Sequence, residues 1–357
     1  MKKLIALACI VLLCAGLLIY SLADPDAPRN DEAQPAVATA DEPKQTGVSI
    51  PETTPAATPD EHRQETVRFL FLNDQPVLQL IYDQLSDEFF QQTGIRMVTV
   101  SSEANLGDQT PVLFSVSDGT PQWPCLDLSD TLACANLACE CFTLKDGERV
   151  LGIANDVEPF GLIYNTALLA RVGYTGADIN RFADLKAVVS YITQNTESLG
   201  FGAFAAADEA FLAGIPGETQ SLLNLYFENP AAGDIPNAGA VFQIGTLADM
   251  EKLSANGELQ LDMLPLYTGG TDEHTQGVHC VVNSFWCVRE DASAEEIQAA
   301  LAFLNFLISP RMDGTVPVDD LCLLAPYRQA VYARNSVQQR FRNDIALGKN
   351  CIVCELY

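Results

Sequence analysis

The start of the folded part alternates between strand-like and helix-like hydrophobic patterns, and this alternation limits the fold more than any other feature. Val67–Leu72 is a short apolar run that ends at two turn residues, Asn73 and Asp74, which is typical of a buried strand. Apolar residues then recur at three- and four-residue steps over residues 77–89, which indicates an amphipathic helix. Ile95–Val100 repeats the strand pattern. Parallel strands need a helical connection of this kind, so the order predicts an α/β fold with mostly parallel sheets flanked by helices.

Strand and helix patterns continue to alternate toward the C-terminus. The further strands that we expect cover residues 112–116, 162–164, 199–205, 240–244 and 278–288. The further helices that we expect cover residues 166–171, 184–194 and a long segment that begins after Ser293. Ser293 is a good N-cap residue, and Glu295 and Glu296 suit the positive end of the helix dipole.

The first 23 residues have the pattern of an export segment. Lys2 and Lys3 precede an uncharged apolar run over residues 4–22. A basic start before an apolar core is typical of a signal peptide, and the run is also just long enough to span a bilayer. A cleaved signal and a retained membrane anchor both stay open. Either one predicts that the rest of the chain lies at the extracellular face of the cytoplasmic membrane, with the two lysines inside.

Residues 24–65 are predicted to form a disordered acidic linker. The segment contains seven prolines, ten acidic residues and no aromatic residue. Such a composition buries too little apolar surface to offset the entropy lost on ordering. The whole chain of 357 residues has a formal net charge of −27. A chain of that charge has few cations to replace the counterions of a phosphate backbone, so nucleic acid is excluded as a partner.

The spacing of the cysteines does not predict a cofactor site. The four that lie close together in the sequence, and that we considered as metal ligands, are Cys125, Cys134, Cys139 and Cys141. Cys351 and Cys354 have the Cys-x-x-Cys spacing of zinc and redox sites, but the sequence contains no second pair of this kind. We therefore expect small buried cysteines, with disulfides allowed outside the cytoplasm, and no metal or cofactor.

Four segments of the chain carry motifs that occur together, in this order, in one protein family. Residues 66–100 have the family's opening strand, helix and strand, and residues 158–165 match its Glu-x-x-x-x-Ile-Tyr-Asn segment. Residues 285–293 and the following helix match its late block of apolar strand, charged turn and Phe-Leu-rich helix. Residues 111–130 match a branch common in gut Firmicutes. Together these motifs resemble the family 1 extracellular solute-binding proteins, which are related to maltose-binding proteins and serve carbohydrate ABC importers.

The resemblance implies a periplasmic-binding-protein-like fold of two lobes, each a mostly parallel sheet flanked by helices, with the ligand in the cleft between them. We expect lobe one to contain residues 66–158 plus 270–312, and lobe two to contain residues 159–269 plus 313–357. The resemblance further implies a protein that is not an enzyme. It would capture a sugar or oligosaccharide by hinge closure and present it to the permease subunits of an ABC transporter.

The second lobe departs from the family pattern. Residues 205–240 are shorter than the helical stretch that the family usually has there, and Thr246 and Leu247 follow Gly245 where relatives commonly place a ligand-facing Trp. Two alternatives to sugar import therefore stay open. One is a degenerate surface sensor or scaffold without sugar binding, and the other is an extracellular glycan-active enzyme that uses paired carboxylates.

Five residues are candidates for the ligand site. Asp74 and Asp118 each follow an expected strand, at the edge where open α/β sheets bind ligands, and match polar sugar contacts of the family. Glu158 matches an acidic contact at the lobe junction of maltose-binding relatives. Trp123 follows a Gly-Thr-Pro loop. Phe285 and Trp286 are adjacent in a strand and therefore point to opposite faces. We expect one of them to lie in the core and the other, Trp286, to face the cleft. Aromatic rings suit the C–H faces of a sugar, and carboxylates suit its hydroxyl groups.

Overall fold

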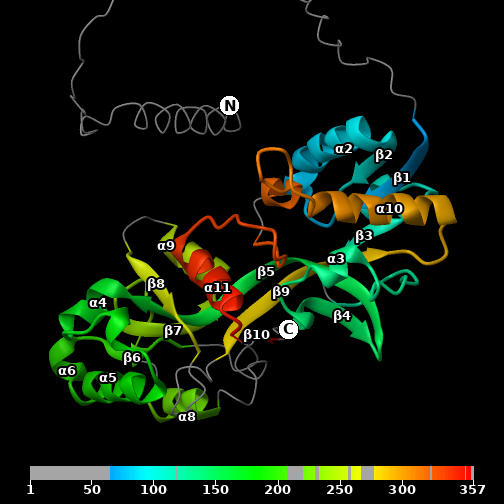
Figure 1. Cartoon of the computed structure of the whole chain (residues 1–357). Helices are drawn as coiled ribbons and strands as arrows, with labels where there is room; N and C mark the ends of the chain where they lie inside the picture. Colours follow the sequence, from blue (N-terminus) through cyan, green and yellow to red (C-terminus); the bar gives the residue numbers. More distant parts are fainter. Residues whose placement is uncertain are drawn as a thin grey trace, which may run out of the picture. The chain divides into compact units, whose positions relative to one another are not determined.

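The structure is a computed structural model, and it describes residues 65–117, 119–206, 220–229, 233–255, 259–266, 277–321, 324–349 and 351–354 (Figure 1). The expected leader, the expected linker up to residue 64 and the candidate Asp118 lie outside the described residues. Among the helices that the structure describes, none is both long enough and apolar enough to cross a membrane.

Strands from the whole described chain join in one connected sheet of mixed direction. The strands are β1 (Val67–Leu72), β2 (Ile95–Val100), β3 (Leu113–Val116), β4 (Thr143–Asp146), β5 (Arg149–Asn165), β6 (Gly202–Phe204), β7 (Ala240–Thr246), β8 (Leu261–Leu264), β9 (Val278–Val288) and β10 (Cys351–Val353). Their order is β2-β1-β3-β9-β5-β7-β6, with β10 beside β9 and with β4 and β8 beside β5. β1 is parallel to β2 and β3, and β6 is parallel to β7. In the middle of the sheet, β9 is antiparallel to β3 and β5.

Helices cover this sheet and connect its strands (Figure 1). The α-helices are α2 (Gln79–Thr93), α3 (Leu132–Ala135), α4 (Thr166–Arg171), α5 (Phe182–Gln194), α6 (Thr196–Leu199), α8 (Gln220–Glu228), α9 (Leu247–Ser254), α10 (Ala294–Leu307) and α11 (Ser336–Ala346). Short 3-10 turns are η1 (Pro76–Leu78), η2 (Glu103–Asn105), η3 (Glu140–Phe142), η4 (Gly176–Asp178) and η7 (Pro317–Leu321).

The strand and helix order expected from the sequence is confirmed for most elements. Ser293 caps α10, because its Oγ accepts a hydrogen bond from the Glu296 backbone N–H at 3.3 Å and donates to the Glu296 carboxylate at 2.7 Å. Gly94 ends α2 with a φ of 79°, a left-handed conformation that favours glycine. The sequence patterns did not predict β4, β8, β10, α3, α6, α8, α9 or α11, and they predicted only the last part of β5. The expected strand over residues 199–205 is shorter in the structure, because Leu199 ends α6 and β6 contains only Gly202–Phe204.

Two large hydrophobic cores lie along the sheet. The first core joins β1, β3 and β9 to α2 and α10. At its centre, the Phe303 ring lies 5.3 Å from Phe89 and 6.3 Å from Phe69, between centroids. The second core joins the end of β5 to α5, β6 and β7. Several buried residues of the segment 313–357, Val318 among them, belong to the first core, and the lobe boundaries drawn from the sequence stay a prediction.

Two long strands, β5 and β9, connect the two cores. Residues 153–159 of β5 pair with β9, whereas residues 160–165 pair with β7 and β8. The change of partner falls next to Pro159, which has no N–H to donate to a strand ladder. β9 also reaches both cores, since Trp286 belongs to the first core and Val281 packs against the second.

A half-buried carboxylate lies where β5 and β9 pair. Asp156 accepts hydrogen bonds from Asn283 Nδ2 at 2.8 Å and from the Leu324 backbone N–H at 3.2 Å. Burial raises the pKa of Asp156 to about 6, and the nearby Glu158 carboxylate adds to this increase, while the hydrogen bond from Asn283 opposes it. The carboxyl therefore holds its proton more tightly in the folded protein than in the unfolded chain.

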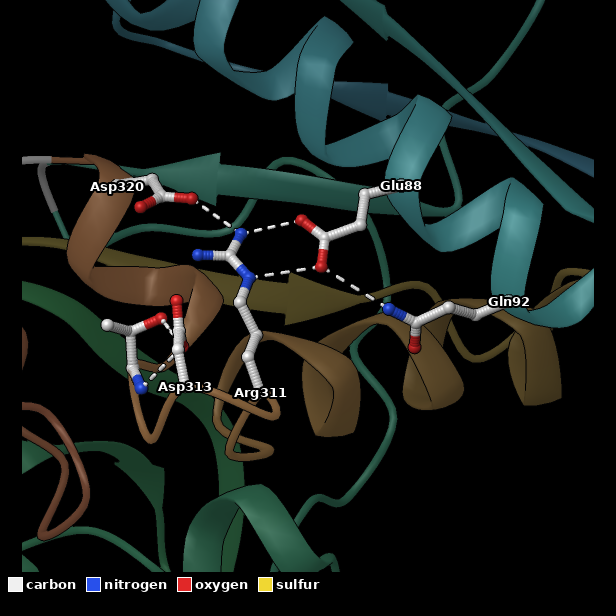
Figure 2. A network of polar contacts seen from close by, with 6 residues as sticks. Glu88, Gln92, Arg311, Asp313 and Asp320 are labelled. Atoms are coloured by element: carbon white, nitrogen blue, oxygen red, sulfur yellow. Dashed lines mark hydrogen bonds and ion pairs between the residues drawn. The ribbon is translucent and has the colours of Figure 1, made fainter. Parts of the chain in front are cut away.

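An ion-pair network joins α2 to the segment that follows α10 (Figure 2). Arg311 donates from Nε and Nη2 to the two carboxylate oxygens of Glu88, at 3.0 and 2.6 Å, and Nη2 also reaches Asp320 at 2.5 Å. The Arg311 side chain is only 21% exposed. A two-bonded arginine–carboxylate pair with this burial is stronger than a typical surface pair. The network therefore joins two segments that are distant in sequence, α2 and residues 311–320.

We expect Arg311→Met to lower the free energy of unfolding by about 1–2 kcal/mol, because Glu88 loses its charged partner. Urea denaturation followed by circular dichroism measures the change. Lys252→Met is the matched control, because Lys252 is 78% exposed and lies 3.5 Å from Asp249. The control should change the free energy of unfolding by less than about 0.5 kcal/mol. Equal losses in the two variants would contradict this account of the network.

We also expect Asp156 to make the protein less stable as the pH rises from 3.8, the ordinary pKa of an aspartic acid, through about 6. Its folded pKa is raised, so the folded state binds more protons than the unfolded state in this window. Asp156→Asn removes the titration and keeps an acceptor. The free energy of unfolding of Asp156→Asn, relative to that of the parent protein, should therefore rise by up to about 3 kcal/mol between about pH 4 and pH 7.5.

Urea denaturation of both proteins at the two pH values tests this expectation. Asp146→Asn, at the exposed end of β4, controls for the substitution itself. If the difference between Asp156→Asn and the parent protein stays the same at both pH values, the carboxyl does not titrate as the structure predicts.

Candidate functional site

A pocket of about 380 Å³ lies at the carboxyl ends of β1, β2 and β3. The residues that follow these strands line it: Asn73 and Asp74 after β1, residues 101–103 after β2, and Ser117 after β3. Trp123 adds an aromatic ring to the wall. The carboxyl ends of parallel strands form the edge at which open α/β sheets bind ligands. We refer to this cavity as the strand-end pocket.

Asp74 is exposed and is positioned by its neighbours. The buried Asn73 side chain accepts a hydrogen bond from the Gln75 backbone N–H at 2.9 Å and donates one to the Gln75 carbonyl at 2.7 Å. These bonds hold the turn after β1, in which asparagine often supplies such local contacts. The Asp74 carboxylate accepts a hydrogen bond from the Ser117 hydroxyl, which joins the ends of β1 and β3. A carboxylate held at this edge can accept hydrogen bonds from the hydroxyl groups of a ligand.

Trp123 is half-buried and is held by an aromatic neighbour. Its ring lies edge-on to Phe114, with centroids 4.9 Å apart and an angle of 74° between the planes. Both residues line the strand-end pocket. An indole fixed in this way loses little conformational freedom when it stacks on the apolar face of a ligand.

Glu158 does not line the strand-end pocket. Its carboxylate accepts a hydrogen bond from the Ala248 backbone N–H in the first turn of α9, where the helix dipole favours a negative charge. Thr246 caps the same helix, with its Oγ1 accepting from the Asp249 backbone N–H at 3.2 Å. Glu158 therefore attaches β5 to α9, beside the position at which the resembling family often has a Trp.

Trp286 lies inside the first core. It is 1% exposed, and its ring stacks on Tyr327 with centroids 6.4 Å apart. Adjacent strand residues do point to opposite faces, but the half-buried residue is Phe285, which packs against the cluster that contains Phe114 and Trp123. A buried ring offers no face to a ligand, so we do not carry Trp286 into the proposed site. Of the five candidates, the structure brings together Asp74 and Trp123.

Several residues that line the strand-end pocket were not predicted from the sequence, among them Ser102, Glu103 and Ser117. A signal for them was present. They follow two expected strands directly, so the rule that selected Asp74 also applies to them.

The turn that carries Asp74 also contacts the strands that connect the two cores. Gln75 Nε2 donates to Ser284 Oγ on β9 at 3.5 Å, and the Ser284 hydroxyl donates to Asn155 on β5. Ser284 and Asn155 are both buried. A continuous hydrogen-bonded path therefore runs from the strand-end pocket to the β5–β9 pair.

Three larger cavities are found elsewhere in the described part of the chain. One of about 510 Å³ is lined by charged residues that pair with one another, since Arg340 contacts Asp262 at 2.6 Å and Lys349 contacts Asp344 at 2.7 Å. A second, of about 460 Å³, is lined by Arg342, which donates to three backbone carbonyls. A third, of about 490 Å³, has no aromatic residue in its lining, and its Asp234 accepts hydrogen bonds from Asn237. These charged groups are used within the protein, so the strand-end pocket is the better candidate for a ligand.

Comparison with known proteins gives matches in structure alone. No protein-family model and no curated protein matches the sequence. A family 1 extracellular solute-binding protein from Bifidobacterium longum subsp. infantis matches with a TM-score of 0.59 and 12% identity, over 81% of this chain and 89% of that one. The cyclic alpha-maltosyl-1,6-maltose binding protein from Arthrobacter globiformis gives 0.60 and 13%, over 80% and 88%. The apo form of RafE from Streptococcus pneumoniae gives 0.57 and 11%, over 82% and 89%.

These structures agree with the resemblance that the sequence motifs indicated. At such low identity the agreement concerns the fold, and it extends over about four fifths of the chain. The chain therefore has the α/β fold of the family 1 extracellular solute-binding proteins.

Proposed function

We propose that this protein binds a sugar or oligosaccharide outside the cytoplasm and presents it to an ABC importer. The observation that carries the proposal is the strand-end pocket, which lies at the ligand-binding edge of a solute-binding-protein fold. One protein with this fold is named for binding cyclic alpha-maltosyl-1,6-maltose. The proposed role is that of a binding protein, in which no covalent bond is made or broken.

The chemistry of the pocket supports an uncharged, polyhydroxylated ligand. Asp74, Glu103 and Ser117 offer acceptors and a hydroxyl group, and Trp123 offers an apolar ring. A sugar presents hydroxyl groups at its rim and C–H groups on its faces, so it pairs with both kinds of side chain.

The shared strands support a mechanism of capture and closure. A ligand in the strand-end pocket contacts residues at the edge of the first core, and closure of the second core over it would require the strands β5 and β9 to bend between the cores. Hinge closure around a bound ligand is a common motion of two-lobed binding proteins. Because the segment 205–240 is short, we expect the second core to add few contacts and the affinity to be weak.

We further propose that the protein is exported and is held at the membrane by its first 23 residues. The basic start and the apolar run over residues 4–22 support this part of the proposal. The permease subunits of the importer would then recognise the closed, ligand-bound form.

We expect Trp123→Ala to weaken sugar binding about two- to tenfold, because the ligand loses a stacking surface. Isothermal titration calorimetry against mono-, di-, tri- and tetrasaccharides measures the affinity. Tyr191→Ala is the matched control, because Tyr191 is 45% exposed on α5, outside the pocket. In the parent protein, Trp286 is 1% exposed, so a change of tryptophan fluorescence on binding should come from Trp123. Failure of every sugar to bind would overturn the proposed function.

We expect Asp74→Asn to weaken the same binding about tenfold, because a neutral amide accepts a weaker hydrogen bond than a carboxylate. The melting temperature of the ligand-free protein should not change, since Asp74 is exposed and the amide oxygen can still accept from Ser117. Asp108→Asn, an exposed aspartate outside the pocket lining, is the control. A lowered melting temperature with unchanged affinity would make Asp74 a structural residue.

A further inference from the structure

Three cysteines from two distant parts of the chain meet at one place. Cys139 and Cys141 lie at η3, and Cys351 begins β10. Their Sγ atoms all lie within 4.8 Å of one another, and all three side chains are half-buried. In the sequence, Cys139 and Cys141 were considered as metal ligands together with other cysteines of the same region. Their proximity to Cys351 was not predictable, because only the fold brings the C-terminal strand to η3.

One backbone N–H of this region donates a hydrogen bond to a sulfur atom of the cluster. Cys139 Sγ accepts a hydrogen bond from the Cys141 backbone N–H at 3.4 Å, and Cys141 Sγ lies 2.8 Å from Cys139 Sγ. Backbone N–H groups that donate to sulfur stabilise thiolates and orient them, as they do in metal sites. The two sulfurs of the Cys-x-Cys segment are therefore directed to the same point.

A fourth thiol lies on the same face. β10 pairs with β9 in parallel, with Cys351 opposite Val278 and Val353 opposite Cys280. Residues two apart in a strand share a face, so Cys280 and Cys351 lie on one side of this pair. Cys280 is buried in the first core, against which Cys139, Cys141 and Cys351 also pack.

We propose that Cys139, Cys141 and Cys351 form a binding site for one Zn²⁺ ion, with Cys280 as a further thiol on the same face. Zinc–sulfur bonds of about 2.3 Å in a tetrahedron place the sulfurs about 3.8 Å apart, so zinc binding would move Cys139 Sγ and Cys141 Sγ apart from their separation of 2.8 Å. Ligands that are all sulfur select soft or borderline ions over Mg²⁺ and Ca²⁺. A disulfide would use two of the three sulfurs, whereas a metal uses all three. The ion would fasten the C-terminal strand to η3.

Zinc titration of the reduced, metal-free full chain tests the proposal. Competition with a chromophoric chelator gives the affinity, and elemental analysis gives the stoichiometry. We expect one Zn²⁺ per chain, and we expect Cys351→Ser and Cys141→Ser each to weaken binding more than tenfold. Cys134→Ser is the matched control, because Cys134 is a half-buried cysteine outside the cluster, and it should bind zinc like the parent protein. With Co²⁺ in place of zinc, the parent protein should show thiolate-to-metal charge-transfer absorption that Cys351→Ser lacks.

Two results would overturn the proposal. One is zinc affinity in both cluster variants equal to that of the parent protein. The other is mass spectrometry of the unreduced protein that finds Cys351 joined to Cys139 or Cys141 by a disulfide. Thermal unfolding of the metal-free variants shows whether each is folded, and either variant alone is sufficient for the test. The outcome does not depend on whether the protein binds sugar.

Discussion

The antiparallel pairing of β5 with β9 supports every other part of the described fold. β5 is 17 residues long. It pairs with β9 along its middle part and with β7 and β8 along its last part, and so connects both cores by one continuous backbone. The first core combines two distant stretches of the chain, residues 69–157 and 280–341, whereas the second core takes nearly all of its residues from 160–266. Each core collects strands and helices on its own part of β5 and β9.

The β5–β9 pair contains polar side chains that are stable next to an apolar core only when they are hydrogen-bonded. Asn155 and Ser284 are buried and hydrogen-bond to each other, and Asp156 is satisfied by Asn283 and by a backbone N–H. A buried polar group without a partner is costly in free energy and rarely persists. Because Asn155 and Asp156 of β5 bond to the adjacent residues Ser284 and Asn283 of β9, the hydrogen bonds specify the register of the pairing. They also continue, through Gln75, to the turn that carries Asp74, so the candidate site and the connecting strands form one polar structure.

The strand-end pocket and the cysteine cluster are assembled by the fold in two different ways. Asp74 and Trp123 come from one region, and the parallel strands β1 and β3 bring their ends together at a sheet edge. The cysteine cluster joins the middle of the chain to its C-terminus through the pairing of β10 with β9. The first arrangement follows a general property of parallel sheets, and the second follows from one particular strand pairing.

Local sequence was sufficient to predict the elements whose burial repeats with a regular period. α2 and α10 were predicted because their apolar residues recur with the period of a helix, β1 was predicted because its short apolar run ends at turn residues, and Asp74 was predicted because it follows β1. The first part of β5 was not predictable, since Asn155 and Asp156 interrupt its apolar pattern and become acceptable there only through partners on β9 and beyond. That Phe285 and Trp286 point to opposite faces of β9 was also predictable from the local sequence. Which of the two is buried depends on the segments that cover each face of the sheet. That choice, like the meeting of the three cysteines, was made by the tertiary fold, because burial and hydrogen bonding between distant segments depend on which surfaces meet and not on the order of residues along the chain.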